Sequence, residues 1–169
     1  MLFRSELLNI LKLKNIKNLK LEFTNIESIP SEIGQSKLVN LSLLGNKKLK
    51  EIPKEIGNLT NLTNLYIQDS PLIDEVPNEI TNLKKLYSLK LSSCNLKEIP
   101  DLNKLENLRY LDISRNKLTT VLNQINKLYL KRLSINHNLI EKQEVLDVIN
   151  KFKRITDYDW QFGKKFWTY

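Results

Sequence analysis

The chain has 169 residues, about the length of one domain, and its 27 Lys and Arg against 19 Asp and Glu give a formal charge of +8. Its single cysteine and single histidine, Cys94 and His137, exclude an internal disulfide and a Cys/His zinc site. No apolar run approaches the ~20 residues of a membrane-spanning helix and no signal peptide is recognisable, which slightly favours an intracellular location and leaves the compartment open.

Residues 1–15 precede the first clear pattern in the chain. The stretch SELLNILKL within them fits a short amphipathic helix that begins at Ser5, because serine is a favoured N-cap residue. It fits equally well a degenerate first repeat of the series that follows. The sequence leaves both interpretations open, an N-terminal cap or a degenerate repeat.

Residues 16–140 contain one pattern six times. Three and five places after an opening aliphatic residue stand two further aliphatic residues, which gives the frame L-x-x-L-x-L. The opening residues, which define place one of each repeat, follow one another at intervals of 22 to 24 residues and are Ile16, Leu38, Leu62, Leu86, Leu108 and Leu130. This period indicates a repeat protein in which each unit packs on its neighbours.

Each repeat predicts a short strand, a turn and a short helical segment. The second and third aliphatic residues of the frame alternate with other residues, which is the period of a strand. Proline, which has no backbone N–H, then interrupts the strand. These prolines are Pro30, Pro53, Pro77 and Pro100. Aliphatic residues next recur at every third place, as in Ile56, Leu59 and Leu62, which fits 3₁₀- or short α-helix on the outer side.

Two segments illustrate the pattern over the length of a repeat, LYIQDSPLIDEVPNEITNLKKL and LRYLDISRNKLTTVLNQINKL. They resemble leucine-rich repeat proteins with Ile-Pro-x-x-Ile type repeats, and six repeats in one register extend the resemblance over 16–140. It implies an α/β fold, a right-handed leucine-rich repeat solenoid with a parallel concave sheet and short 3₁₀ or α segments on the convex side. Repeat five departs from the pattern, since Val121 and Leu122 replace Ile-Pro.

The ninth place of the repeat is a column of small, mostly polar residues. It holds Thr24, Asn46, Ser70, Cys94, Asn116 and Asn138. In leucine-rich repeat proteins this column is a ladder of asparagines that hydrogen-bond backbone groups of the turn, and cysteine is a common substitute. The resemblance therefore implies a structural role for Cys94, as a buried and unreactive thiol.

Residues 141–169 are expected to close the C-terminal end, because an uncapped solenoid exposes its core. Val145, Val148, Ile149 and Phe152 share one helical face after Glu141, which predicts a capping helix. The stretch 152–169 holds 7 of the 13 aromatic residues of the chain. We expect this aromatic tail to seal the last repeat, and the alternative is a surface for self-association.

The residues that alternate with the strand leucines should line the concave face. Over six repeats they include four basic and three acidic residues, so this face is nearly neutral and lacks the basic stripe that a nucleic acid requires. Aromatic and arginine residues among small polar ones are typical of protein-binding hot spots. The predicted partner-binding residues are Phe23, Leu44, Tyr66, Lys90, Tyr110 and Arg115.

Catalysis finds no support in the sequence. It contains no glycine-rich phosphate loop, and its carboxylates are not gathered in a recognisable pair, so we predict no enzyme, cofactor or metal. The expected function is a non-catalytic scaffold that binds another protein through the concave sheet. Two alternatives stay open: a glycan- or cell-surface adhesion module, because Asn, Ser and Tyr can hydrogen-bond sugar hydroxyls, and a targeting domain of a larger protein.

Overall fold

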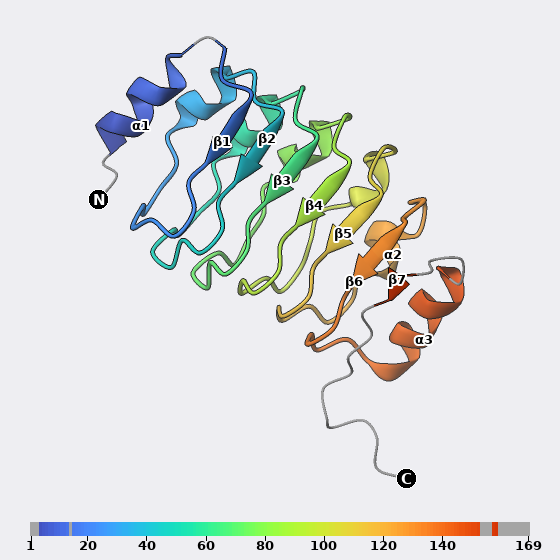
Figure 1. The fold of residues 1–169 in the computed structure, drawn as a ribbon. Coiled ribbons are helices and arrows are strands. Elements are labelled where there is room, and N and C mark those ends of the chain that lie inside the picture. Colours follow the sequence, from blue (N-terminus) through green and yellow to red (C-terminus); the bar gives the residue numbers. More distant parts are fainter. Residues whose placement is uncertain (1–3, 14, 153–156, 159–169) are drawn as a thin grey trace.

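A computed structural model describes residues 4–13, 15–152 and 157–158, and it shows six coils stacked side by side (Figure 1). Each coil contributes one three-residue strand. These strands are β1 (Asn18–Lys20), β2 (Asn40–Ser42), β3 (Asn64–Tyr66), β4 (Ser88–Lys90), β5 (Tyr110–Asp112) and β6 (Arg132–Ser134). A further short strand, β7 (Asp157–Tyr158), lies beside β6.

The strands form one parallel sheet whose spatial order, β1 to β7, is the order of the sequence. The central leucines of the six repeat strands pair in a single row across this sheet. They are Leu19, Leu41, Leu65, Leu89, Leu111 and Leu133. The predicted fold class, a solenoid with a parallel sheet, is confirmed.

Short helical segments cover the convex side. They are η1 (Ser31–Gln35), η2 (Lys54–Asn58), η3 (Asn78–Asn82), η4 (Leu102–Lys104) and α2 (Leu122–Ile125), and the η segments are 3₁₀-helix. The prolines of the turns start the first three: the carbonyl of Pro30 accepts the Ile33 N–H at 3.0 Å, and Pro53 and Pro77 make the same bond to Ile56 and Ile80. Proline fits this place because its fixed φ suits the start of a helix and no N–H is needed there.

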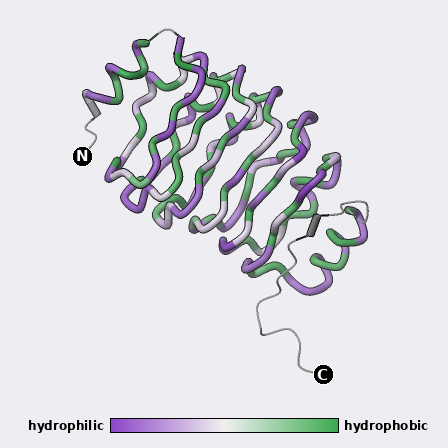
Figure 2. Tube along the Cα trace, viewed as in Figure 1, coloured by the Kyte–Doolittle hydropathy of each residue, from purple (hydrophilic) through white to green (hydrophobic). Residues whose placement is uncertain are grey.

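The core lies between the sheet and the convex segments. Hydrophobic stretches recur at matching places in successive coils, separated by hydrophilic ones (Figure 2). The aliphatic residues of the frame are buried except for the partly buried Ile16, and residues of the turns and convex segments such as Ile33, Ile56 and Ile80 are buried too. Stacking neighbouring repeats therefore produces one continuous apolar core, which no single repeat could bury alone.

A helix stands at each end of the stack. Helix α1 (Arg4–Leu11) packs near η1, and its Leu7 is only 1% exposed. Helix α3 (Lys142–Lys151) follows Glu141, and its buried residues Val145 and Val148 lie on the face expected from the sequence. Apart from Phe152, which is buried, and β7, the aromatic tail lies outside the described residues, and so does any test of its expected sealing or self-associating role.

No helix in the described part of the chain combines the length and the hydrophobicity needed to cross a bilayer.

Candidate functional site

The turn at the end of each strand fixes the direction of the residues that border the concave face. At place eight, five residues other than glycine have a positive φ of 52° to 56°: Phe23, Asp69, Ser93, Arg115 and His137. The sixth residue of this column is Gly45, with φ 73°. Left-handed backbone is costly for residues with a Cβ, and at these five places it sets the direction in which the Cα–Cβ bond leaves the turn.

Asparagines of the ninth place hold these turns together. The Nδ2 of Asn46 donates to the carbonyls of Leu21 and Leu43 at 2.6 and 2.8 Å, and its Oδ1 accepts the N–H of Thr24 at 3.1 Å. Asn116 and Asn138 bond the corresponding carbonyls of their own repeats and of the preceding ones. Each amide therefore joins two repeats through backbone groups that would otherwise be buried without partners.

Cys94 occupies the same column with weaker contacts. Its Sγ lies 3.5 Å from the carbonyl of Ile67 and 3.7 Å from that of Ser92. The residue is partly buried, whereas the sequence led us to expect full burial. Burial is the main cause that raises the pKa of the Cys94 thiol to about 11; the backbone of Ser70 opposes it and the charge of Asp69 adds to it. The thiol is therefore protonated at neutral pH, which fits a structural role.

A cleft of about 480 Å³ opens on the concave face over β3 to β6. Its lining includes four of the six predicted partner-binding residues, namely Tyr66, Lys90, Tyr110 and Arg115. It also includes Tyr87 and Arg132, which were not in that prediction. The other two predicted residues, Phe23 and Leu44, do not line the cleft.

Aromatic contacts shape the walls of the cleft. The Nζ of Lys90 lies 5.0 Å from the centre of the Tyr66 ring, within the range of a cation–π interaction. The rings of Tyr87 and Tyr110 are 5.3 Å apart and tilted by 57°. Tyr87 stands at place two, before its strand, but its carbonyl accepts the N–H of Tyr110 at 3.1 Å. The strand register implies this pairing of Tyr87 with the next repeat. It was therefore the signal that could have identified Tyr87 as a residue of the concave face.

Small residues form the floor of this region. Four serines at outward places of repeats four to six are buried although they face away from the core: Ser88, Ser92, Ser114 and Ser134. Ser88 pairs with Tyr110 in the strand register, and Lys90 pairs with Asp112. Because serines stand beside tyrosines and long basic residues, the larger side chains rise around a hollow. A side chain on a concave sheet can therefore point away from the core and still be shielded from solvent, as these serines are.

The N-terminal half of the concave face is built differently. Asn18, Asn40 and Asn64 follow one another at place three, and the Nδ2 of each later residue donates to the Oδ1 of the one before. Beside them the Phe23 side chain is 73% exposed, and its N–H donates to the carbonyl of Leu44 at 2.7 Å. This half therefore presents one exposed aromatic ring and an amide ladder, whose last member, Asn64, also lines the cleft.

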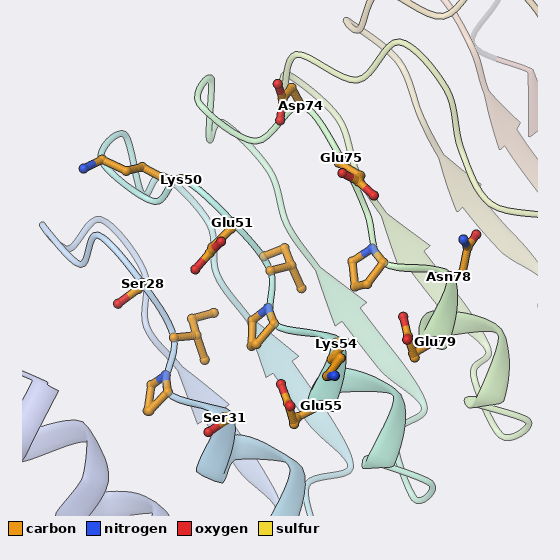
Figure 3. Close-up of a pocket in the computed structure, with 15 residues that line it drawn as sticks. Ser28, Ser31, Lys50, Glu51, Lys54, Glu55, Asp74, Glu75, Asn78 and Glu79 are labelled. Carbon is orange, nitrogen blue, oxygen red and sulfur yellow. The ribbon is translucent and has the colours of Figure 1, made fainter.

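A second hollow, of about 750 Å³, lies beside the Ile-Pro and Val-Pro turns of the first three repeats (Figure 3). Its lining contains more carboxylates than lysines: Glu51, Glu55, Asp74, Glu75 and Glu79 against Lys50 and Lys54. In the described part of the chain, no three His, Cys, Asp or Glu side chains are placed to hold a metal ion. The acidic residues come from equivalent turns, so the repetition of the turn sequence accounts for their clustering.

Comparisons with known proteins agree with this architecture. The family model described as leucine-rich repeat region matches residues 3–164. A leucine-rich repeat protein of Leptospira interrogans superimposes with a TM-score of 0.79 at 30% identity, over 93% of this chain. An internalin of Listeria monocytogenes gives 0.70 at 21% identity over 88%, and the plant peptide hormone receptor RGFR1, solved in complex with RGF2, gives 0.66 at 32% over 76%.

These structures are longer than the present chain. It spans 40% of the Leptospira protein, 42% of the internalin and 22% of the plant receptor. No curated protein matches the sequence significantly.

Proposed function

The chain belongs to the leucine-rich repeat family, and from that premise we propose that it is a non-catalytic scaffold that binds another protein through the concave cleft over β3 to β6. The single observation that carries the proposal is the composition of this cleft. It combines three tyrosines with lysine and arginine in one hollow of about 480 Å³. Tyrosine and arginine are the residues most often found as energetic anchors of protein interfaces.

The similar structures support binding to a protein. The plant receptor was solved in complex with RGF2, and it shares 32% of its residues with this chain over the matched region. The internalin, at 21% identity, supports only the fold. Neither similarity identifies a partner of this chain, so the proposal rests on the residues that line the cleft.

A non-catalytic role agrees with the chemistry of the only thiol and the only imidazole. Cys94 lies in repeat four and keeps its proton at neutral pH because burial raises its pKa to about 11. His137 lies in the turn after β6, two repeats further along the sheet. A thiol without a neighbouring base is a poor nucleophile.

Two alternatives follow from specific features of the same face. The amide ladder of Asn18, Asn40 and Asn64 offers hydrogen-bonding groups that a glycan could use, which is the basis of the adhesion alternative. The second alternative is a targeting domain of a larger protein. Its basis is that this chain spans only 40% and 42% of two similar proteins. The cleft favours protein binding over both, because it adds tyrosine and arginine side chains of the kind that anchor protein interfaces.

The test is affinity capture from the native host with three immobilised chains: wild type, Tyr66→Ala and Arg115→Ala. We expect one partner protein to be captured by the wild type and each substitution to weaken its binding by ~1–3 kcal/mol, as is usual for hot-spot residues. Both variants should keep a melting midpoint close to that of the wild type, because neither side chain is part of the buried core.

A matched control is Lys97→Ala, which removes an exposed lysine outside the cleft. The convex Lys84 is unsuitable as a control, since its Nζ donates to the carbonyls of Thr81 and Lys104 at 2.8 and 3.1 Å. A partner that is lost with Lys97→Ala and retained by both cleft variants would contradict the proposal. Binding on a glycan array that depends on Asn40, without any captured protein, would favour adhesion.

A further inference from the structure

The charges of the concave face are divided unevenly between its two halves. In repeats one to three, the outward places carry one basic residue, Lys20, and two acidic ones, Glu22 and Asp69. In repeats four to six, a single acidic residue, Asp112, stands among three basic ones. The basic residues are Lys90, Arg115 and Arg132, and all three line the cleft. The cleft is thus the basic end of a face whose opposite end is slightly acidic.

Two of these cations have no carboxylate partner among the described residues. Neither the Lys90 ammonium nor the Arg115 guanidinium forms an ion pair there. The nearby Asp112 carboxylate is engaged within its own strand end, where its Oδ1 accepts the N–H and the hydroxyl of Ser114 at 3.1 and 2.6 Å. A ligand that brings a carboxylate into the cleft would therefore supply the missing charge and form strong charge-assisted hydrogen bonds.

One of the two cations is held in position before a ligand arrives. Lys90 rests over the ring of Tyr66, whereas Arg115 carries an exposed side chain on a backbone with φ 56°. The paired rings of Tyr87 and Tyr110 form a further part of the lining. Side chains that are already ordered lose less entropy on binding, which makes a small cleft more effective.

The rest of the face argues against a ligand with many negative charges. A polyanion that extended toward β1 would meet the exposed Asp69 and the carboxylate of Glu22. That end offers instead the exposed ring of Phe23 and the partly buried Leu44. The face fits a segment with an acidic residue at one end and an apolar residue at the other.

Resting on the proposed function, we propose that the cleft binds an aspartate or glutamate of an extended protein segment, while Phe23 and Leu44 contact an apolar side chain of the same segment. The apolar contact lies over β1 and β2 and the cations over β4 and β5. Three strand spacings of ~4.8 Å separate these pairs, which an extended chain spans in about four residues. The expected motif is an acidic and an apolar residue about four positions apart.

The experiment is selection of a random dodecapeptide library displayed on phage against the intact chain. Selected peptides are synthesised with acetylated and amidated ends and measured by fluorescence anisotropy at two salt concentrations. We expect the motif to be enriched and the affinity to fall as salt rises, because exposed charge pairs are screened. Changing the peptide's acidic residue to its amide should weaken binding about tenfold.

The same peptides are then measured on protein variants. Lys90→Gln combined with Arg115→Gln should also weaken binding about tenfold and abolish the difference between acidic peptide and amide, whereas Lys97→Gln should preserve both values. Phe23→Ser should weaken peptides that carry the apolar residue and leave unchanged the same peptides with serine at that position.

The outcomes separate this inference from the proposed function. If the selected peptides lack acidic residues but bind Tyr66→Ala more weakly than the wild type, the acidic motif is wrong and concave-face protein binding still holds. Selected peptides that bind every concave-face variant as tightly as the wild type would overturn both the acidic motif and the proposed function. Failure to select any peptide, with binding of a heparin fragment that depends on Arg115, would overturn the inference in favour of an anionic glycan.

Discussion

The ring of Phe23 lies directly over the α-carbon of Gly45. A Cβ on residue 45 would stand 2.4 Å from Cδ1 of Phe23, closer than two non-bonded carbon atoms can approach. Gly45 also has φ 73°, a conformation that residues with a Cβ adopt only at a cost. The most exposed aromatic ring of the N-terminal half is therefore supported by the one glycine of the place-eight column.

We predict that Gly45→Ala lowers the free energy of unfolding by about 1–3 kcal/mol, through backbone strain and displacement of the Phe23 ring. Urea unfolding followed by circular dichroism measures the loss. In a Phe23→Ala background the clash is absent, so Gly45→Ala should cost only the ~1–2 kcal/mol of the left-handed backbone. Equal losses in the two backgrounds would show that the ring does not rest on Gly45.

A second prediction concerns Cys94. Cys94→Asn should be neutral or stabilising, since an amide can bond the carbonyl of Ile67 as Asn116 bonds that of Leu91. Cys94→Leu should cost on the order of 1–3 kcal/mol, because it leaves turn groups without a partner. Iodoacetamide should label the native thiol slowly at pH 8 and faster as the pH approaches the pKa of about 11. Rapid stoichiometric labelling at pH 8 would contradict the assignment.

Helix α3 is tied to repeat five by Glu144. Its Oε1 accepts the N–H groups of Val121 and Leu122 at 2.6 and 2.9 Å and the hydroxyl of Thr120 at 2.7 Å. These bonds satisfy the start of α2, where Val121 has no side-chain cap of its own. Burial alone would raise the pKa of Glu144, but the hydrogen bonds outweigh it and lower the pKa below its ordinary value of 4.5.

Glu144→Ala should therefore destabilise the protein by roughly 0.5–2 kcal/mol, as the loss of a helix cap does. A carboxyl whose pKa is depressed by folding stabilises the protein above its unfolded pKa and loses that effect as the pH falls through its folded pKa. The difference between wild type and Glu144→Gln in denaturant unfolding should thus be largest at neutral pH and shrink in acid. Glu141→Ala, which removes no cap hydrogen bond, is the control.

A fourth prediction concerns β7. A chain that ends at residue 152 lacks this strand and leaves the edge of β6 unpaired, so it should lose about 1–3 kcal/mol for the backbone hydrogen bonds and aggregate more readily. A chain that ends at 158 keeps the strand and should be more stable. Melting curves and light scattering compare the two with the full chain, and identical results for all three would refute a sealing role.

The repeat frame was sufficient to predict the strands, their parallel order and the buried leucines. Period two in Leu19 and Leu21 and its recurrence in every repeat leave only one way to align the strands in register. The turns at Pro30 and Pro53 were equally predictable, since proline has a fixed φ and no N–H and therefore interrupts a strand. Local chemistry and repetition together determined these features.

The remaining features depend on contacts that a single repeat does not encode. Phe23 and Arg115 have left-handed backbone, yet neither residue type indicates it; in that column Gly45, Asp69 and His137 are the residue types that do. Tyr87 joins the cleft through pairing with the following repeat. Glu144 reaches Val121 across 23 residues, and no sequence signal marks that capping bond.

The close backbone contacts between elements of the described chain join adjacent units of the stack, from α1 with η1 to β6 with β7. Force applied to the two ends would therefore detach the outermost unit without first loosening the middle of the stack. Each repeat of 22 to 24 residues would release about 80 Å of extended chain as it detached. Under tension, the molecule would lengthen in regular steps from its ends, while the interior repeats and the cleft that they carry kept their shape.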